Sequence, residues 1–274
     1  MAVKVRFWGV RGSISTPSPR HIAFGGNTSC IEVRIGERLI ILDAGTGIRN
    51  LGNSLVKEDI KSFDILLSHT HWDHMNGFPF FAPAYDPKCD ITIKAGHLID
   101  QGGLKRVLSD QMTQPMFPVP LEAMNSRMSI EDFRTGENLS MGDGIEIKTA
   151  MLNHPNGATG YRIEHDGRSL CYITDTEDVP GKPDKNILNL IEGADLVIYD
   201  SIYTEEEFPA KVGWGHSTWN EGVKLCRSAG AGSMAIFHHD PDHEDDFMDK
   251  LETEARGEWN NVFAAREQME VELA

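Results

Sequence analysis

Three histidines and an aspartate lie within the six-residue segment HTHWDH, at positions 69–74, which Ser68 joins to the predicted strand 64–67. Because alternate residues of extended backbone face the same side, His69 and His71 can bind one ion where the chain leaves a predicted sheet. If the chain then turns into a helix, Asp73 and His74 face a second ion beside the first. Imidazole and carboxylate groups are ligands for zinc and related divalent metals. The segment therefore predicts a metal site at a strand end.

Short apolar runs, most of them bounded by Gly, Pro, Asn or Asp, recur along the chain and predict strands. These strands cover residues 3–8, 30–33, 39–43, 65–68, 91–94, 145–150, 161–164, 169–174, 196–200 and 234–238. Helices are predicted over 218–229, with Ser217 as N-cap, and over 244–255, which begins with acidic residues. Early hairpins followed by strands separated by helices predict an α/β (α+β) fold, with sheets flanked by helices in one domain, 1–274.

Segment 96–144 departs from this regular pattern. It contains three prolines and five of the 11 methionines of the chain. We expect it to form a lobe over the edge of a sheet. Its apolar side chains either pack in the ordinary way or form the wall of a substrate pocket or a dimer contact.

Composition excludes several classes of function. The net charge of −16 disfavours binding to nucleic acid by a broad basic surface, which needs many Lys and Arg side chains. The longest apolar runs are far shorter than the roughly 20 residues that a membrane-spanning helix requires. The first residues, MAVKVRFWGV, show no export signal, and the four cysteines are widely spaced. We therefore expect a cytoplasmic protein that does not bind membranes.

Further candidate ligands lie where predicted strands end. His154 follows the run 145–152, Asp175 closes the run 171–174, and His239 comes just after 235–237. Each residue alone could be a turn former or an exposed polar side chain. Together they lie at the carboxyl ends of strands, where α/β sheets place their active sites.

The residues described so far resemble those of metallo-β-lactamase-fold hydrolases. The resemblance rests on the loop LDAGTG at 42–47, the HTHWDH segment and the later His, Asp and His. The motifs YITDT at 172–176, GHST at 215–218 and FHH at 237–239 are similar to the phosphodiesterase branch of that superfamily, as are GVRGS and GGNTS near the N-terminus. That branch includes RNase Z, the tRNA 3′-processing nuclease, and cyclic-phosphate diesterases.

The resemblance implies a four-layer αββα sandwich with a dinuclear site between its two sheets. It implies one ion held by His69, His71 and His154, a second held by Asp73, His74 and His239, and Asp175 bridging the two. His238 is the alternative to His239, which is preferred because His238 still continues the predicted strand. The cofactors are expected to be two divalent ions, zinc or else manganese.

Two of these residues are expected to take part in catalysis. Asp73 can orient a metal-bound hydroxide and accept its proton. His216 resembles the histidine of the phosphodiesterase branch that helps the leaving oxygen depart; the alternative is that it caps a helix or supports a ligand. Asp200 is expected to accept a hydrogen bond from a ligand histidine.

These observations predict a dinuclear phosphodiesterase that cleaves a small cyclic or nucleotide-derived phosphodiester. The family resemblance, and no feature of the chain itself, favours a homodimer. RNA is a less favoured substrate, because RNase Z holds tRNA with a basic arm and segment 96–144 has only scattered Lys105, Arg106 and Arg127. The alternatives are an RNase Z-like endonuclease, a thioesterase or lactonase of the same fold, a di-iron redox protein and a metal-binding regulator. The redox class typically carries a carboxylate where this chain has His71, together with a flavin-binding domain.

Overall fold

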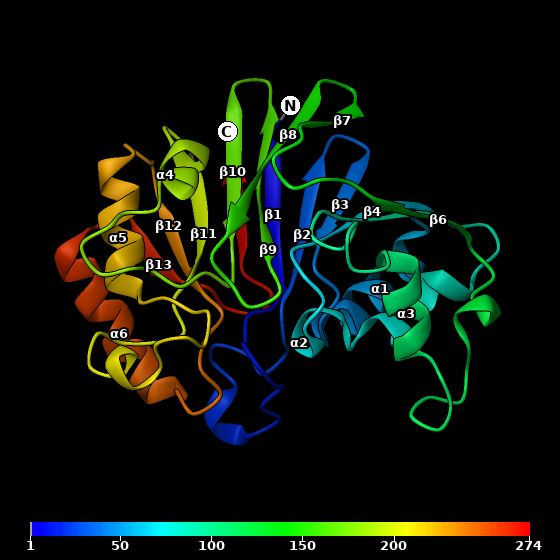
Figure 1. Ribbon diagram of the computed structural model, residues 1–274, viewed down its shortest axis with the longest axis horizontal. Helices are drawn as coiled ribbons and strands as arrows, with labels where there is room; N and C mark the ends of the chain where they lie inside the picture. The colour runs from blue at the N-terminus through cyan, green and yellow to red at the C-terminus, as the bar shows by residue number, and fades with distance from the viewer. Residues whose placement is uncertain (1) are drawn as a thin grey trace.

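The computed structural model describes residues 2–274, which form two mixed β-sheets packed face to face (Figure 1). The first sheet has the order β14 (Glu270–Leu273), β1 (Val3–Gly9), β2 (Cys30–Ile35), β3 (Arg38–Leu42), β4 (Ser62–Leu67), β5 (Asp90–Ala95) and β6 (Arg127–Asp132). The second has the order β13 (Val262–Ala264), β12 (Met234–Phe237), β11 (Leu196–Asp200), β10 (Arg168–Ile173), β9 (Ala158–His165), β8 (Ile145–Leu152) and β7 (Leu139–Gly142).

Helices cover the outer face of each sheet. The first sheet carries α1 (Gly47–Glu58), α2 (Trp72–Met75) and α3 (Leu104–Gln111), whereas the second carries α4 (Lys185–Ile191), α5 (Trp219–Ser228) and α6 (Asp245–Glu258). Figure 1 shows the two groups of helices on opposite sides of the paired sheets. None of the helices within residues 2–274 has the length and apolar character that crossing a membrane requires.

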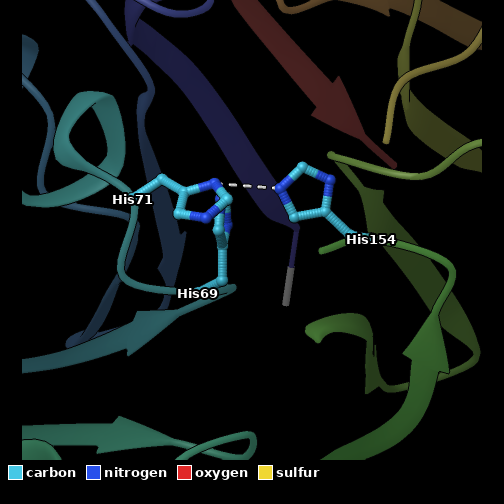
Figure 2. Close-up of side chains that lie close together, drawn as sticks. All are labelled: His69, His71 and His154. Atoms are coloured by element: carbon cyan, nitrogen blue, oxygen red, sulfur yellow. Dashed lines mark hydrogen bonds between the residues drawn. The ribbon is translucent and has the colours of Figure 1, made fainter. Parts of the chain in front are cut away.

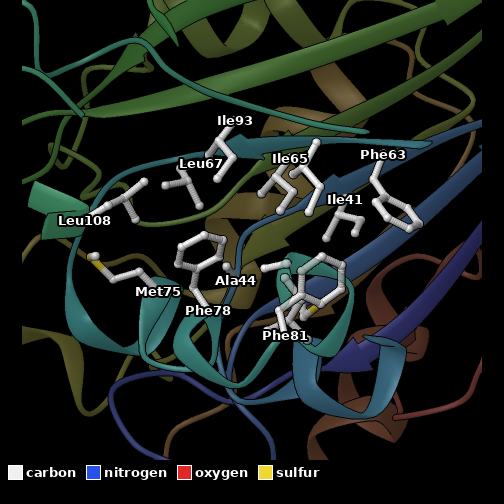
Figure 3. Close-up of a cluster of buried hydrophobic side chains, with 14 of the residues drawn as sticks. Ile41, Ala44, Phe63, Ile65, Leu67, Met75, Phe78, Phe81, Ile93 and Leu108 are labelled. Carbon is white, nitrogen blue, oxygen red and sulfur yellow. The ribbon is translucent and has the colours of Figure 1, made fainter. Parts of the chain in front are cut away.

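Alternation along the strands builds three apolar cores. On β4, Ile65 and Leu67 face the helices of the first sheet, as Figure 3 shows, whereas Leu66 faces the second sheet. On β10, Tyr172 faces the first sheet and Ile173 faces α4 and α5. Because successive side chains of a strand point to opposite faces, each central strand must be apolar on both sides. The predicted four-layer αββα arrangement is confirmed.

The carboxyl ends of several strands meet at one edge of this sandwich. Strands β3 to β6 are mutually parallel, and so are β10 to β13. Strand β8 runs in the same direction as β10, because both are antiparallel to β9. The loops that follow β4, β8, β10 and β12 therefore emerge close together, and they carry the predicted ligands.

Helix α5 begins at Trp219, one residue later than predicted, and its N-cap is Thr218 instead of Ser217. The Thr218 hydroxyl accepts a hydrogen bond from the Glu221 backbone N–H at 3.2 Å. The Ser217 hydroxyl, expected in this role, instead lies 3.1 Å from the Tyr199 hydroxyl and donates to Asp178. Ser217 therefore connects the helix start to β11 and to the loop after β10.

Segment 96–144 supplies an edge strand to each sheet. It contains α3, then β6 at the edge of the first sheet, then β7 at the edge of the second. The segment thus passes from one sheet to the other in addition to covering a sheet edge. Its role in substrate binding or dimer formation stays a prediction.

Candidate metal centre

Seven polar side chains converge where β4, β8, β10 and β12 end. We define the first donor set as His69, His71 and His154, and the second donor set as Asp73, His74 and His238. Asp175 lies between the two sets. The segment HTHWDH contributes to both because it leaves β4 in extended form and then enters α2 at Trp72.

The histidines of the first donor set face one another from two different sheets (Figure 2). The ring centroids of His69 and His71 lie 4.5 Å apart, and those of His71 and His154 lie 4.8 Å apart. The Nδ1 atom of His71 lies 3.0 Å from the Nε2 atom of His154. Three nitrogens can therefore be directed at one point between the sheets.

Hydrogen bonds determine which ring nitrogens are available to a metal. The Ser68 hydroxyl donates to Asp43, so it accepts from the Nδ1–H of His69, 3.1 Å away. The Nδ1–H of His154 donates to the Gly215 carbonyl at 2.7 Å. In both neutral rings Nε2 therefore carries a free lone pair, and the buried Nε2 of His69 has no hydrogen-bond partner.

The second donor set is tighter. The Nε2 atoms of His74 and His238 lie 3.1 Å apart. An Asp73 carboxylate oxygen lies 3.2 Å from the first of these nitrogens and 3.1 Å from the second. The backbone N–H of Ser13 donates to the same oxygen at 2.8 Å, which fixes the Asp73 side chain.

Asp175 directs one carboxylate oxygen at each donor set. Its Oδ2 lies 3.1 Å from the Nε2 of His74 and 3.4 Å from that of His238. Its Oδ1 lies 3.6 Å from the Nε2 of His69 and 3.7 Å from that of His154. This is the placement expected of a carboxylate that bridges two ions.

The spacing of these atoms suits divalent cations. Two ligands bound at 2.0–2.1 Å to a tetrahedral zinc ion lie roughly 3.3 Å apart. The contacts of 3.0–3.4 Å within the two donor sets and between Asp175 and the second set are close to that spacing. Imidazole nitrogens and carboxylate oxygens, one of them a buried nitrogen without a partner, therefore fit a pair of zinc-like ions.

Electrostatics supports the same conclusion. Burial lowers the pKa of His69, His71 and His154, which keeps these rings neutral and able to bind a metal. Burial alone would raise the pKa of Asp73 and Asp175, but the neighbouring histidines hold both well below the usual range. Both carboxylates are therefore ionised.

His74 shows how strongly this point favours positive charge. Burial alone would lower its pKa, yet Asp175, Asp73 and Asp43 together raise it well above the usual value. A divalent cation would supply positive charge at the same place.

The choice of His239 as a ligand is wrong on geometry. Strand β12 ends at Phe237, and His238 then turns the chain with a φ of 62°. His238 consequently faces the centre, whereas the fully buried His239 points away and donates from Nε2 to the Ala265 carbonyl at 2.8 Å. The error came from assuming that the strand continues through His238.

Asp43 supports the centre and was not identified from the sequence. Its Oδ2 accepts hydrogen bonds from His74 Nδ1 at 2.7 Å, the Tyr172 hydroxyl at 2.7 Å and the Ser68 hydroxyl at 2.8 Å. Because His74 donates from Nδ1, its Nε2 is left facing the other donors. The available signal was an acidic residue directly after β3, another strand that ends at this edge.

His216 lies beside the two donor sets and belongs to neither. Its ring stacks on that of His238 with centroids 5.1 Å apart, and its Nδ1 lies 2.9 Å from an Asp200 oxygen. Burial alone would lower the pKa of His216, but Asp200, followed by Asp175 and Asp73, raises it to about 9. Asp200 was expected to accept a hydrogen bond from a ligand histidine. It instead accepts one from His216, and it lies 3.9 Å from the Nδ1 of His238.

A short loop holds His154 in place. Gly215 has a φ of +87°, and a Cβ there would lie 2.3 Å from the Nδ1 of His154, so only glycine allows this approach. The Glu177 carboxylate accepts from the backbone N–H groups of Gly213 and Gly215 at 2.7 and 2.8 Å. Glu177 therefore fixes the carbonyl that orients His154.

Comparisons with known proteins agree with this geometry. The family model described as "Beta-lactamase superfamily domain" matches residues 38–239. Ribonuclease Z of Thermoplasma volcanium is 28% identical, and the alignment covers 99% of this chain and 97% of that protein. The crystal structure of the metallo-β-lactamase fold protein YhfI from Bacillus subtilis superposes with a TM-score of 0.74 at 18% identity, covering 99% of both chains.

A crystal structure described as a new diphosphatase from the PhnP family superposes with a TM-score of 0.71 at 16% identity, over 99% of this chain and 98% of that one. At such identities the superpositions show the fold alone, whereas the family model covers most of the chain. The chain therefore belongs to the beta-lactamase superfamily and has the metallo-β-lactamase fold.

Proposed function

We propose that this metal-dependent hydrolase is a dinuclear phosphodiesterase that acts on a small cyclic or nucleotide-derived phosphodiester. His69, His71 and His154 would hold one ion, Asp73, His74 and His238 the other, and Asp175 would lie between them. Zinc fits this donor chemistry, and manganese is the alternative. When bound, such a pair of ions supplies a nucleophile at neutral pH and stabilises charge on the attacking and leaving oxygens.

The observation that carries the proposal is the His216–Asp200 pair. Asp200 accepts from Nδ1 of His216 at 2.9 Å and favours the protonated ring, which makes His216 a proton donor next to both donor sets. An alkoxide that leaves phosphorus needs such a donor. Asp73, held by the Ser13 N–H, is placed to accept the proton of the attacking group, the complementary role to that of His216.

Charge also favours an anionic substrate. The two donor sets and Asp175 contribute two carboxylates, fewer negative charges than the four positive charges of two divalent ions. The centre would therefore attract a phosphodiester even though the whole chain carries a net charge of −16. Neutral thioesters and lactones gain less from this field, and they have less need of a proton donor at His216.

Two observations favour a small diester over tRNA. Within segment 96–144, Arg127 pairs with Asp90 and Arg106 with Asp110, which leaves little free positive charge for RNA. The alignment to the Thermoplasma volcanium ribonuclease Z spans 318 positions, whereas this chain has 274 residues. That relative therefore has segments without a counterpart in this chain.

Purified protein of measured metal content tests the proposal. We expect hydrolysis of bis(4-nitrophenyl) phosphate and of cyclic nucleotides, and little turnover of lactones, glutathione thioesters or precursor tRNA. Efficient tRNA 3′ processing would favour the RNase Z-like alternative. That alternative is the second candidate because the sequence relatives are named ribonuclease Z. Bound iron with redox-active spectra would favour a di-iron redox protein. The homodimer stays a prediction, which light scattering would test.

A further inference from the structure

A cavity of about 190 Å³ lies directly beside the first donor set. It lies among the loop after β5, helix α3 and the loop after β8. Its walls include His69, His71, His97, Gln101, Val107 and Asn156. A group that occupies this cavity would therefore touch the same histidines that would hold a metal ion.

Neutral groups form the walls of this cavity. Among the described residues that line it there is no Lys, Arg, Asp or Glu. Leu98 and Val107 contribute apolar surface, and Gln101 and Asn156 contribute amide groups. A second phosphate or another anionic group would find no cation here, which argues against polyanionic substrates in this cavity.

His97 is the buried polar group of this cavity. It is only 9% exposed, and its Nε2 lies 3.2 Å from the Thr70 hydroxyl, next to His69 and His71. Its Nδ1 is buried without a hydrogen-bond partner among the described residues. Buried polar atoms are normally paired, and this nitrogen, which has almost no accessible surface, would meet a group in the cavity only after a small shift of the His97 ring.

Gln101 holds the cavity open between two loops. Its amide N–H₂ donates to the His97 carbonyl at 3.0 Å and to the Asn156 carbonyl at 3.1 Å. Both amide protons are thereby used, and the Gln101 side-chain oxygen is left as an acceptor. The cavity thus offers apolar faces together with hydrogen-bonding edges in a rigid frame.

We propose that this cavity binds the nucleobase of the substrate, so that the enzyme prefers nucleotide phosphodiesters over phosphodiesters without a base. This proposal rests on the proposed function. A nucleobase is a neutral planar ring with apolar faces and a polar edge, and proteins bind it by packing side chains on its faces and hydrogen-bonding its edge. A metal centre that takes the phosphate and a neutral cavity beside it match the two ends of a nucleotide.

The test compares two esters with the same leaving group. Thymidine 5′-(4-nitrophenyl phosphate) carries a base, and methyl 4-nitrophenyl phosphate does not. We expect the metal-loaded wild type to show at least about a tenfold higher kcat/KM for the thymidine ester, since the base adds contacts in the cavity that the methyl ester lacks. Val107→Phe, which fills the cavity from α3, should remove this preference by lowering kcat/KM for the thymidine ester much more than kcat/KM for the methyl ester.

Lys105→Phe is the matched control, because it places the same side chain on an exposed position of the same helix outside the cavity. It should retain the preference. Saturation-transfer NMR with thymidine, which has no phosphate, gives a second readout: signal with the wild type and with Lys105→Phe, and none with Val107→Phe. Equal kcat/KM for the two esters, or an undiminished preference in Val107→Phe, overturns the base-binding proposal. If neither ester is hydrolysed, the proposed phosphodiesterase function fails, and the thymidine NMR signal alone then decides whether the cavity binds a base.

Discussion

Substitutions of the neighbouring residues His238 and His239 should have different effects, because one is a proposed metal ligand and the other lies in the buried core. Asparagine is the substitution to use at both positions, because it tolerates the left-handed conformation that His238 adopts with a φ of 62°. His238→Asn removes one nitrogen of the second donor set. His239→Asn removes a buried ring that bonds the Ala265 carbonyl.

The structure gives the size of each effect. Structural zinc sites with four ligands bind with about 10–16 kcal/mol, so one ligand contributes roughly 3 kcal/mol, or about a hundredfold in affinity. His238→Asn should therefore lower the affinity of the second ion by about a hundredfold and reduce activity accordingly. His239→Asn leaves a buried carbonyl without its donor, which costs about 1–3 kcal/mol of unfolding free energy, but it should retain both ions.

Equilibrium dialysis against buffered zinc measures metal content, and thermal unfolding measures stability. At a zinc concentration that gives the wild type two ions, we expect one ion in His238→Asn and two in His239→Asn. The melting temperature of His239→Asn should fall by several degrees. Two ions in His238→Asn together with one in His239→Asn would refute the assignment and restore His239 as the ligand.

Three further outcomes follow from the site. His216→Ala should keep both ions and lower kcat by about 10²–10⁴-fold on diesters with alkoxide leaving groups, but much less on 4-nitrophenyl esters; equal losses on both would exclude proton donation to the leaving oxygen. Asp43→Asn should lower the affinity for the second ion by about 10–100-fold, because His74 Nδ1 loses its charged acceptor. A zinc titration measures this affinity, and an unchanged value would contradict the role of Asp43. Removal of metal with a chelator should abolish hydrolysis and lower the melting temperature, with both restored by zinc, whereas activity that survives verified metal removal would contradict a metal-dependent mechanism.

The strands that the sequence pattern identified are the inner ones. All ten predicted strands have counterparts, whereas β6, β7, β13 and β14 have none in the sequence-based expectations. These four are the outermost strands at both ends of both sheets. An edge strand need not be apolar on both faces, and β6 is largely exposed along its length. Without a continuous apolar run, such strands give no clear periodic signal.

Helix α1 was missed for a different reason. It contains Gly47 and Gly52, and glycine disfavours helix formation in an isolated segment. A Cβ on Gly47 would lie 2.5 Å from the Trp8 carbonyl oxygen, and one on Gly52 would lie 2.8 Å from the Phe81 ring. Close packing against β1 and the loop after α2 therefore requires residues that local helix propensity argues against.

Tertiary contacts that override local sequence preference also separate the site residues that the sequence could identify from those it could not. The segment at 69–74 is visible because its ligands are neighbours in the chain, and local periodicity is enough to direct them. Asp43, which the sequence analysis missed, and His238, which it ranked second, instead reach the centre through left-handed turns at the ends of β3 and β12, with φ values of 61° and 62°. Asp175 turns in the same way, with a φ of 57°, but its place at the end of a predicted strand identified it. Such a conformation is uncommon for residues other than glycine and persists only where surrounding contacts hold it, as functional sites often do. If an ordinary strand end is assumed after β12, the side chain expected to point inward is that of His239, which is why His239 was chosen over His238.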